Sequence, residues 1–143
     1  MLKRYTFWLW SAVVFQLLTA GIHAIGLFVQ VEPQNETERQ LQAIITTYRI
    51  DAGGGFHPTF QNLFIALSSC FTFVGLLGGL TNAYLLKKGA DAGLMKGIVG
   101  INALIFGAIF AVMAVFTFLP PIICTGLIFV TLTVSFILVR SEN

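Results

Sequence analysis

Five polar side chains in this sequence are of types that can move a proton or hold a polar ligand: His23, Asp51, His57, Gln61 and Asn62. A histidine paired with an aspartate could transfer protons, because the imidazole ring changes its charge near neutral pH. The two amides could hold a lipid headgroup or a small polar ligand through hydrogen bonds. No spacing among the five defines a reaction, and none matches the HxxH or HExxH patterns that bind zinc. We therefore expect a candidate ligand-binding site with no metal and no cofactor.

Some of these residues also have a purely structural interpretation. His23 lies within an apolar segment, where the penalty on an ionisable group favours a functional role. The alternative is a neutral His23 that hydrogen-bonds one of the two amides or a backbone carbonyl. The stretch RIDAGGGFHPTFQN, residues 49–62, is either the rim of a site or a glycine and proline corner between two helices. A corner explains the glycines and the proline but leaves Asp51 and His57 unexplained.

The composition indicates an integral membrane protein. Hydrophobic residues make up 57% of the chain, charged residues only 10%, and the mean hydropathy is +0.87. A soluble domain has about a quarter charged residues, so this chain has too few to cover a surface in water. Four segments without acidic or basic residues approach or exceed the ~20 residues of a membrane span, and hydrocarbon requires them to be helices. They are residues 6–29, 59–86, 97–119 and 121–139.

The basic residues predict how these segments are oriented. With four spans, six basic residues fall on the side that holds both termini and only two fall on the other side. The six are Lys3, Arg4, Lys87, Lys88, Lys96 and Arg140, and the two are Arg39 and Arg49. Basic residues gather on the cytoplasmic side, so we predict a multi-pass protein of the cell membrane with both termini in the cytoplasm. The net charge of +2 then reflects topology, and we expect no binding to nucleic acid.

Residues 36–51 are predicted to form an amphipathic helix between the first two apolar segments, on the extracytoplasmic side. Asn35 can cap this helix, and Glu38 completes an arrangement like a capping box. Apolar residues recur at helical spacing as far as Ala52. Gly53–Gly55 can end the helix, because glycine adopts positive φ angles without steric cost. The helix is too short and too polar to span, so it should lie on the membrane surface or over the mouth of the bundle.

Small and polar residues form stripes along the first three apolar segments, at intervals of three or four residues. Lipid provides no hydrophobic drive between helices, so their association depends on close backbone approach and occasional hydrogen bonds. We interpret the stripes as the faces through which the helices pack. The polar members include Gln16, Gln30 and Asn82, and the packing glycines are Gly75, Gly79, Gly93, Gly97, Gly100 and Gly107. The last segment, 121–139, contains only one glycine, Gly126, at which another helix could approach closely. We expect this segment to face lipid or a partner subunit.

The connections between the apolar segments predict their arrangement. Residues 87–96 and 120–121 are short links, which make the second and third segments, and the third and fourth, antiparallel neighbours. The expected fold is therefore all-α, an integral membrane up-down four-helix bundle with an extracytoplasmic surface helix between its first two helices. We expect residues 1–143 to form a single transmembrane domain.

Three short strings carry a resemblance. HAIGLF, NETERQLQ and DAGGG together resemble a group of small, uncharacterised four-helix membrane proteins of bacteria. That resemblance implies a four-helix membrane fold and brings no activity with it. The chain is also similar in size and helix count to the DoxX-like family and to the eicosanoid and glutathione (MAPEG) membrane family. The arginine-rich motifs of the latter are missing from this sequence, and no site residue is transferred from either family.

Two hypotheses of function follow from these patterns. The first is a non-enzymatic accessory or self-associating subunit with a lipid or small-ligand pocket at its outer face. Its partners would be membrane lipids and either further copies of itself or a larger membrane complex. The second is a membrane enzyme or transporter for a lipophilic substrate, using His23, Asp51 and His57. A subunit should tolerate His23→Ala and His57→Ala, whereas an enzyme should keep its fold and lose turnover.

Overall fold

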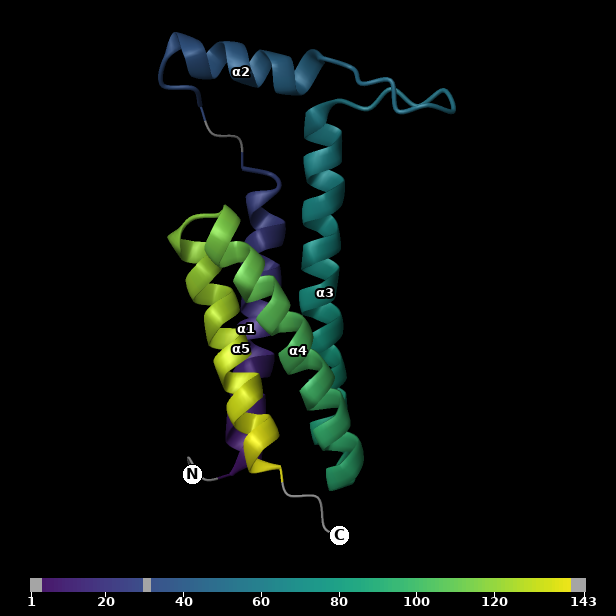
Figure 1. The fold of residues 1–143 in the computed structure, drawn as a ribbon, viewed down its shortest axis with the longest axis vertical. Coiled ribbons are helices and arrows are strands. Elements are labelled where there is room, and N and C mark those ends of the chain that lie inside the picture. The colour runs from purple at the N-terminus through teal and green to yellow at the C-terminus, as the bar shows by residue number, and fades with distance from the viewer. Residues whose placement is uncertain (1–3, 30–31, 140–143) are drawn as a thin grey trace. The chain divides into compact units, whose positions relative to one another are not determined.

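The computed structural model describes residues 4–29 and 32–139, and in this part of the chain it contains five helices (Figure 1). They are α1 (Tyr5–Gly26), α2 (Glu36–Thr47), α3 (Phe60–Lys88), α4 (Ala92–Phe116) and α5 (Leu119–Leu138). All except α2 are long and apolar enough to cross a membrane. This confirms the prediction of an all-α chain with four long apolar helices. Expectations that involve Lys3, Gln30 and Arg140 lie outside the described residues.

The ends of the long helices differ from their predicted bounds by a few residues, for local reasons. α4 begins at Ala92 rather than at residue 97, because the Asp91 side chain accepts a hydrogen bond from the Leu94 backbone N–H at 2.9 Å and caps the helix. α5 begins at Leu119 and takes both prolines of the connection into its first turn, where their missing N–H groups would have no helical partner. α1 ends at Gly26, before the predicted residue 29.

The chain forms two compact units, which we describe separately. The first consists of residues 1–20 and 74–143, and the second of residues 21–73. α1 and α3 each contribute one part to the first unit and the other part to the second. The expectation of a single transmembrane domain stays a prediction.

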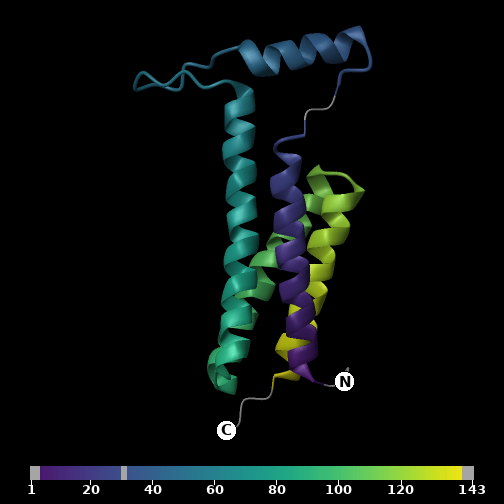
Figure 2. The same ribbon diagram turned by 180° about the vertical axis from the view of Figure 1, so that it is seen from behind.

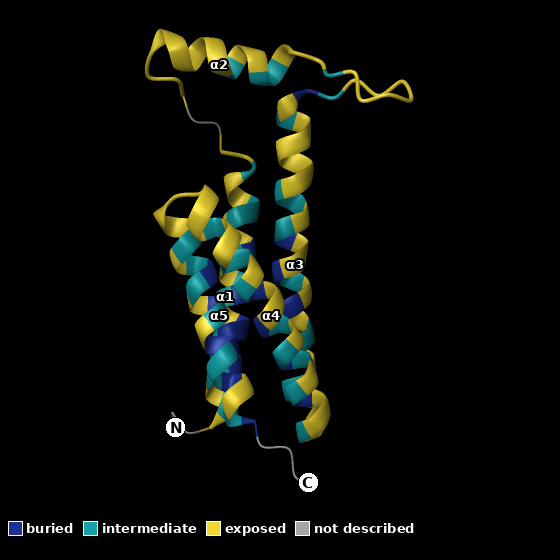
Figure 3. Ribbon diagram, in the orientation of Figure 1, coloured by how far each residue is buried: buried dark blue, intermediate teal, exposed yellow. Residues whose placement is uncertain are grey.

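The first unit is built around α4 and α5, which pack against each other (Figure 1, Figure 2). Its apolar core also includes residues of α1, and buried positions lie on α1, α4 and α5 as well as on α3 (Figure 3). The Ser135 hydroxyl donates a hydrogen bond to the Tyr5 carbonyl at 3.2 Å and so links α5 to α1. The buried apolar residues are Leu9, Ala12, Met95, Val99, Ala103, Phe106, Ile128, Leu132 and Val139.

α5 is more deeply packed than its sequence suggested. We expected this helix to face lipid or a partner, but a larger share of it than of α4 is buried. Its buried face carries Thr125, Thr131 and Ser135 as well as apolar residues. The Thr125 and Thr131 hydroxyls donate to the carbonyls of Pro121 and Leu127, each at 2.7 Å. Small hydroxyl side chains whose donors are satisfied within the helix let neighbours approach closely, so a glycine stripe is not required.

Two glycines of α3 lie against α1 in the first unit. A Cβ atom added at Gly75 would be 3.2 Å from the Ala20 Cβ, and one added at Gly79 would be 2.9 Å from the Leu17 Cδ2. Real Cβ atoms rarely approach other atoms this closely. A larger side chain at Gly79 would therefore require Leu17 to move.

The glycines of α4 fall into two classes. A Cβ atom added at Gly100 would be 2.9 Å from the Phe136 ring, and one added at Gly107 would be 2.8 Å from the Phe129 ring. These two glycines make room for aromatic rings of α5. Nothing described lies within 4 Å of a Cβ added at Gly97, and a Cβ at Gly93 would meet only the nearby Asp91 side chain. A Cβ added at Gly93 or Gly97 would therefore contact no other described helix.

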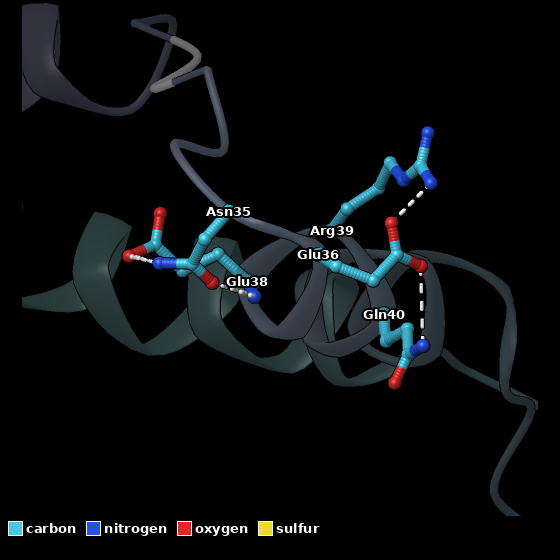
Figure 4. A network of polar contacts seen from close by, with 5 residues as sticks. All are labelled: Asn35, Glu36, Glu38, Arg39 and Gln40. Carbon is cyan, nitrogen blue, oxygen red and sulfur yellow. Dashed lines mark hydrogen bonds and ion pairs between the residues drawn. The ribbon is translucent and has the colours of Figure 1, made fainter.

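α2 belongs to the second unit and begins where the sequence predicted. The Asn35 side chain accepts a hydrogen bond from the Glu38 N–H at 2.9 Å, and the Glu38 carboxylate in turn accepts one from the Asn35 amide at 2.9 Å (Figure 4). The Glu36 carboxylate pairs with Arg39 and accepts from Gln40 on the next turn. The bond from the Glu38 N–H satisfies one of the backbone donors that the first turn of a helix leaves free, and the other contacts join side chains of that turn.

α2 ends earlier than predicted. We expected a helix over residues 36–51 that the glycines terminate, but it ends at Thr47 and Tyr48 is extended. Arg49 pairs with Thr59 in an antiparallel bridge, and the Ile50 N–H donates to the Pro58 carbonyl at 2.9 Å. The Ile50 and Ala52 N–H groups are therefore bonded across a turn, to the Pro58 and Phe56 carbonyls, and are not available to a helix. Gly53–Gly55 form this turn with φ angles of 78°, 60° and 83°, which only glycine adopts readily.

Candidate functional site

The second unit contains a groove of about 790 Å³ between α2, the residues that follow α1, and the start of α3. Volumes of this order are typical of small-molecule sites. Figure 1 and Figure 2 both show α2 running crosswise to the first turns of α3. The apolar lining residues are Leu27, Phe28, Val29, Pro33, Leu41, Ile45, Phe64 and Ile65, and the polar ones are Glu32, Glu38, Gln42, Thr46 and Gln61.

One face of α2 forms a wall of this groove. Leu41 and Ile45 lie one turn apart on that face, together with Glu38, Gln42 and Thr46. Ile44 does not line the groove and is 55% exposed. The amphipathic spacing that predicted α2 is thus the pattern that gives the groove an apolar wall.

An aromatic contact and a second cap position the start of α3 beside α2. The Tyr48 ring, just after α2, stacks on the Phe60 ring with centroids 6.4 Å apart. The Thr59 N–H and hydroxyl both donate to the Asn62 Oδ1, at 3.0 and 2.8 Å, and the Asn62 N–H donates back to the Thr59 hydroxyl. This reciprocal cap fixes where α3 begins and so places Gln61 and Phe64 at the groove.

The charged groups at the groove are all acidic. Glu32 and Glu38 line it, and no lysine, arginine or histidine of the described residues does. Both carboxylate oxygens of Glu38 already accept hydrogen bonds, from the Asn35 side chain and from the Gln34 N–H at 2.7 Å. Glu32 makes no hydrogen bond or ion pair with any described residue. The groove therefore combines apolar walls with one satisfied and one free carboxylate.

His23 is half-buried on α1 and lies outside the groove lining. Its ring packs edge-on against Phe71, with centroids 5.0 Å apart and an interplanar angle of 78°. The Nε2 atom is buried and has no hydrogen-bond partner among the described residues. The expected structural alternative, a hydrogen bond to an amide or a carbonyl, is therefore absent at this nitrogen, and an aromatic contact takes its place.

Most of the other predicted site residues form hydrogen bonds with residues that are close to them in the sequence. The Asp51 carboxylate accepts a hydrogen bond from the Gly53 N–H at 3.0 Å and so stabilises the glycine turn. His57 is exposed, and its backbone carbonyl accepts a hydrogen bond from the Arg49 side chain at 3.2 Å. Asn62 caps α3. Among the described residues, no hydrogen bond or ion pair joins any two of the five predicted residues, and only Gln61 lines the groove.

A cluster of polar side chains that was not predicted from the sequence lies in the first unit. Gln16 and Asn82 are both 0% exposed, and the Asn82 amide donates to the Gln16 Oε1 at 3.2 Å. The Gln16 amide donates to the Asn102 Oδ1 at 3.5 Å, the outer limit of a hydrogen bond. Gly78 lies beside the cluster. Gln16 and Asn82 were members of the predicted stripes, but Asn102 and Gly78 were not singled out.

The chemistry that these arrangements support is binding. In residues 4–29 and 32–139, no three His, Cys, Asp or Glu side chains are grouped so that they could hold a metal ion. The groove can take an apolar chain along α2 and a polar group beside Glu32. The chain matches no protein-family model, and no curated protein or solved structure is significantly similar to it.

Proposed function

We propose that this chain is a small multi-pass membrane protein, a non-enzymatic accessory subunit that binds a lipid or similar amphiphile in the groove beside α2. The observation that carries the proposal is the groove itself, about 790 Å³ with apolar walls and a polar rim. Lipids and other amphiphiles have this same division between an apolar chain and a polar head.

The surfaces of the long helices support placement in a membrane. Large apolar side chains are exposed along them, among them Leu67 at 70%, Leu104 at 76% and Ile137 at 70%. Soluble monomers rarely expose extended apolar patches, whereas lipid accommodates them without penalty.

The distribution of basic residues supports an orientation with both termini in the cytoplasm, which places α2 and its groove at the outer face. In a cysteine-free background, we expect a membrane-impermeant maleimide to label Thr47→Cys in intact cells. The exposed Lys88→Cys should react only after permeabilisation. The reverse pattern would show that the orientation is wrong.

The separation of His23, Asp51 and His57, the residues that the alternative of an enzyme or transporter would use, supports a non-enzymatic role. An enzyme or transporter that used His23, Asp51 and His57 would need them to act on one substrate, yet no described contact joins them. We therefore expect His23→Ala and His57→Ala to be tolerated, and no observation favours the enzymatic alternative.

Self-association is the second part of the proposal. Gly93 and Gly97 are spaced as in small-xxx-small motifs, and a Cβ added at either would meet no atom of another described helix within 4 Å. A second copy, or another subunit of a membrane complex, could pack into the shallow hollow that these two glycines line together with Phe136. Native mass spectrometry of protein released gently from its membrane gives the stoichiometry, and a strictly monomeric spectrum would contradict this part.

The same spectrum tests ligand binding with a matched pair of variants. Ile45→Trp places an indole in the groove, whereas Ile44→Trp adds the same side chain at a neighbouring position that does not line it. We expect the wild type and Ile44→Trp to retain a bound amphiphile, and Ile45→Trp to lose about tenfold in occupancy, equivalent to ~1.4 kcal/mol. Equal occupancy in the two variants, or no bound mass in the wild type, would overturn the proposal.

A further inference from the structure

We infer that the groove beside α2 selects an amphiphile with an ammonium headgroup over one with an anionic headgroup. This inference rests on the proposed function and names the chemical class of the ligand. It follows from the two carboxylates that line the groove and from the lack of a described basic residue in its lining.

Glu32 is the side chain that would contact the headgroup of the ligand. It lines the groove and has no partner among the described residues, whereas Glu38 already accepts two hydrogen bonds. An ammonium group is the natural partner for a free carboxylate beside an apolar wall. A phosphate or sulfate placed there would be repelled by both glutamates.

No described basic residue of the second unit lines the groove to offset these carboxylates. Its charged residues are four acids and two arginines, and neither arginine lines the groove. Arg39 pairs with Glu36 on a neighbouring part of α2, and Arg49 donates to the His57 carbonyl. The complementary headgroup for this surface is therefore positive.

Aromatic residues add to the same preference. Phe28 and Phe64 both line the groove. The faces of aromatic rings attract ammonium groups, and quaternary ammonium ligands are recognised by aromatic rings in this way. Leu41, Ile45 and Ile65 provide the apolar surface for the attached chain.

The test compares three lipids that share the same dioleoyl chains. They carry a trimethylammonium group alone, a phosphocholine group, or a phosphoglycerol group. The full chain is placed in bilayer nanodiscs that contain the three lipids in equal amounts, and native mass spectrometry counts those retained. We expect both ammonium lipids to be enriched over phosphoglycerol by about threefold, the size of a cation–π contact at an exposed site. Enrichment of the trimethylammonium lipid alone would identify the ligand as an amphiphile with a purely cationic head. Enrichment of both ammonium lipids would identify the ligand as a zwitterionic lipid.

Two charge-neutralising variants locate the effect. Glu32→Gln should clearly reduce the headgroup preference, to what Glu38 and the aromatic rings provide, while lipid is still retained. Asp51→Asn removes one acid from the same unit outside the groove, and its side chain can still accept from the Gly53 N–H, so the preference should persist. Lipid retention by the wild type without any headgroup preference, or a preference that Glu32→Gln leaves undiminished, would overturn this inference and leave the proposed function standing. Loss of all lipid retention in the wild type would overturn both.

Discussion

Replacing Gly78 with valine is expected to lower the free energy of unfolding by about 3 kcal/mol, at the upper end of typical overpacking costs. A Cβ atom at this position would lie 2.6 Å from the Gln16 Nε2, 2.8 Å from the Asn102 Oδ1 and 3.2 Å from the Phe106 ring. Gln16 and Phe106 are fully buried in the first unit and Asn102 is partly buried, so a displaced Gln16 amide would have no water to bond. The substitution must therefore displace a buried amide as well as strain the packing.

The matched control for Gly78→Val is Gly21→Val. Gly21 is also helical, but nothing described lies within 4 Å of an added Cβ there, so only the small difference in helix propensity applies. Unfolding of both variants can be followed by steric trapping or by titration with denaturing detergent. A loss of similar size at both positions would contradict the contacts assigned to Gly78.

The second large effect is expected at the buried amide pair. Asn82→Leu and Gln16→Leu should each lower the free energy of unfolding by about 1–3 kcal/mol, because each leaves its partner unsatisfied in the core. The double variant should lose less than the sum, since no orphaned amide of the pair then remains. In bilayers such couplings average about 0.6 kcal/mol, so the cycle must be measured in one lipid environment. Strict additivity would show that the two side chains do not act as a pair.

Replacing Asn82 removes more than its hydrogen bond to Gln16, because the other polar atom of its side chain is buried as well. Its Oδ1 atom is buried and has no partner among the described residues. The wild-type cluster therefore already contains one unsatisfied acceptor, which lowers the net value of the Asn82–Gln16 bond. For this reason we expect Gln16→Leu to be at least as destabilising as Asn82→Leu.

The helices could be predicted because the physics of a spanning segment leaves few choices. A stretch of about 20 apolar residues without charges must pair its backbone internally, and length alone then identifies α1, α3, α4 and α5. Their ends could not be fixed in this way. The start of α4 depends on the Asp91 cap, and the end of α2 depends on the pairing of Arg49 with Thr59. Both are decided by single contacts that hydropathy does not encode.

The candidate site was harder to predict, because residue type alone does not distinguish a ligand-binding group from a local cap. Asp51 and Asn62 were chosen for their polar side chains, yet both bond nearby backbone groups, as short polar side chains commonly do. The groove is instead lined mainly by apolar residues from three separate segments, which no motif marks. Its one signal in the sequence was the helical spacing of Leu41 and Ile45.

The packing role of Gly78 could likewise not be predicted from the sequence. The predicted stripe ran through Gly75 and Gly79 at a spacing of four residues. Gly78 follows Gly75 by three residues and fits a helical stripe equally well. Only the positions of Gln16 and Asn102, on two other helices, show that Gly78 has the shortest contacts of the glycines in this unit.

The most direct test of the groove as an amphiphile site is photo-crosslinking. A phospholipid that carries a diazirine in its acyl chain is incorporated into the bilayer around the wild-type protein, and the labelled residues are mapped by peptide mass spectrometry. We predict labels on Leu41, Ile45 and Phe64, which line the groove, and little label on Ile44. Labelling of Ile44 as strong as that of Ile45, or labels confined to the exposed faces of the long helices, would contradict a lipid in the groove.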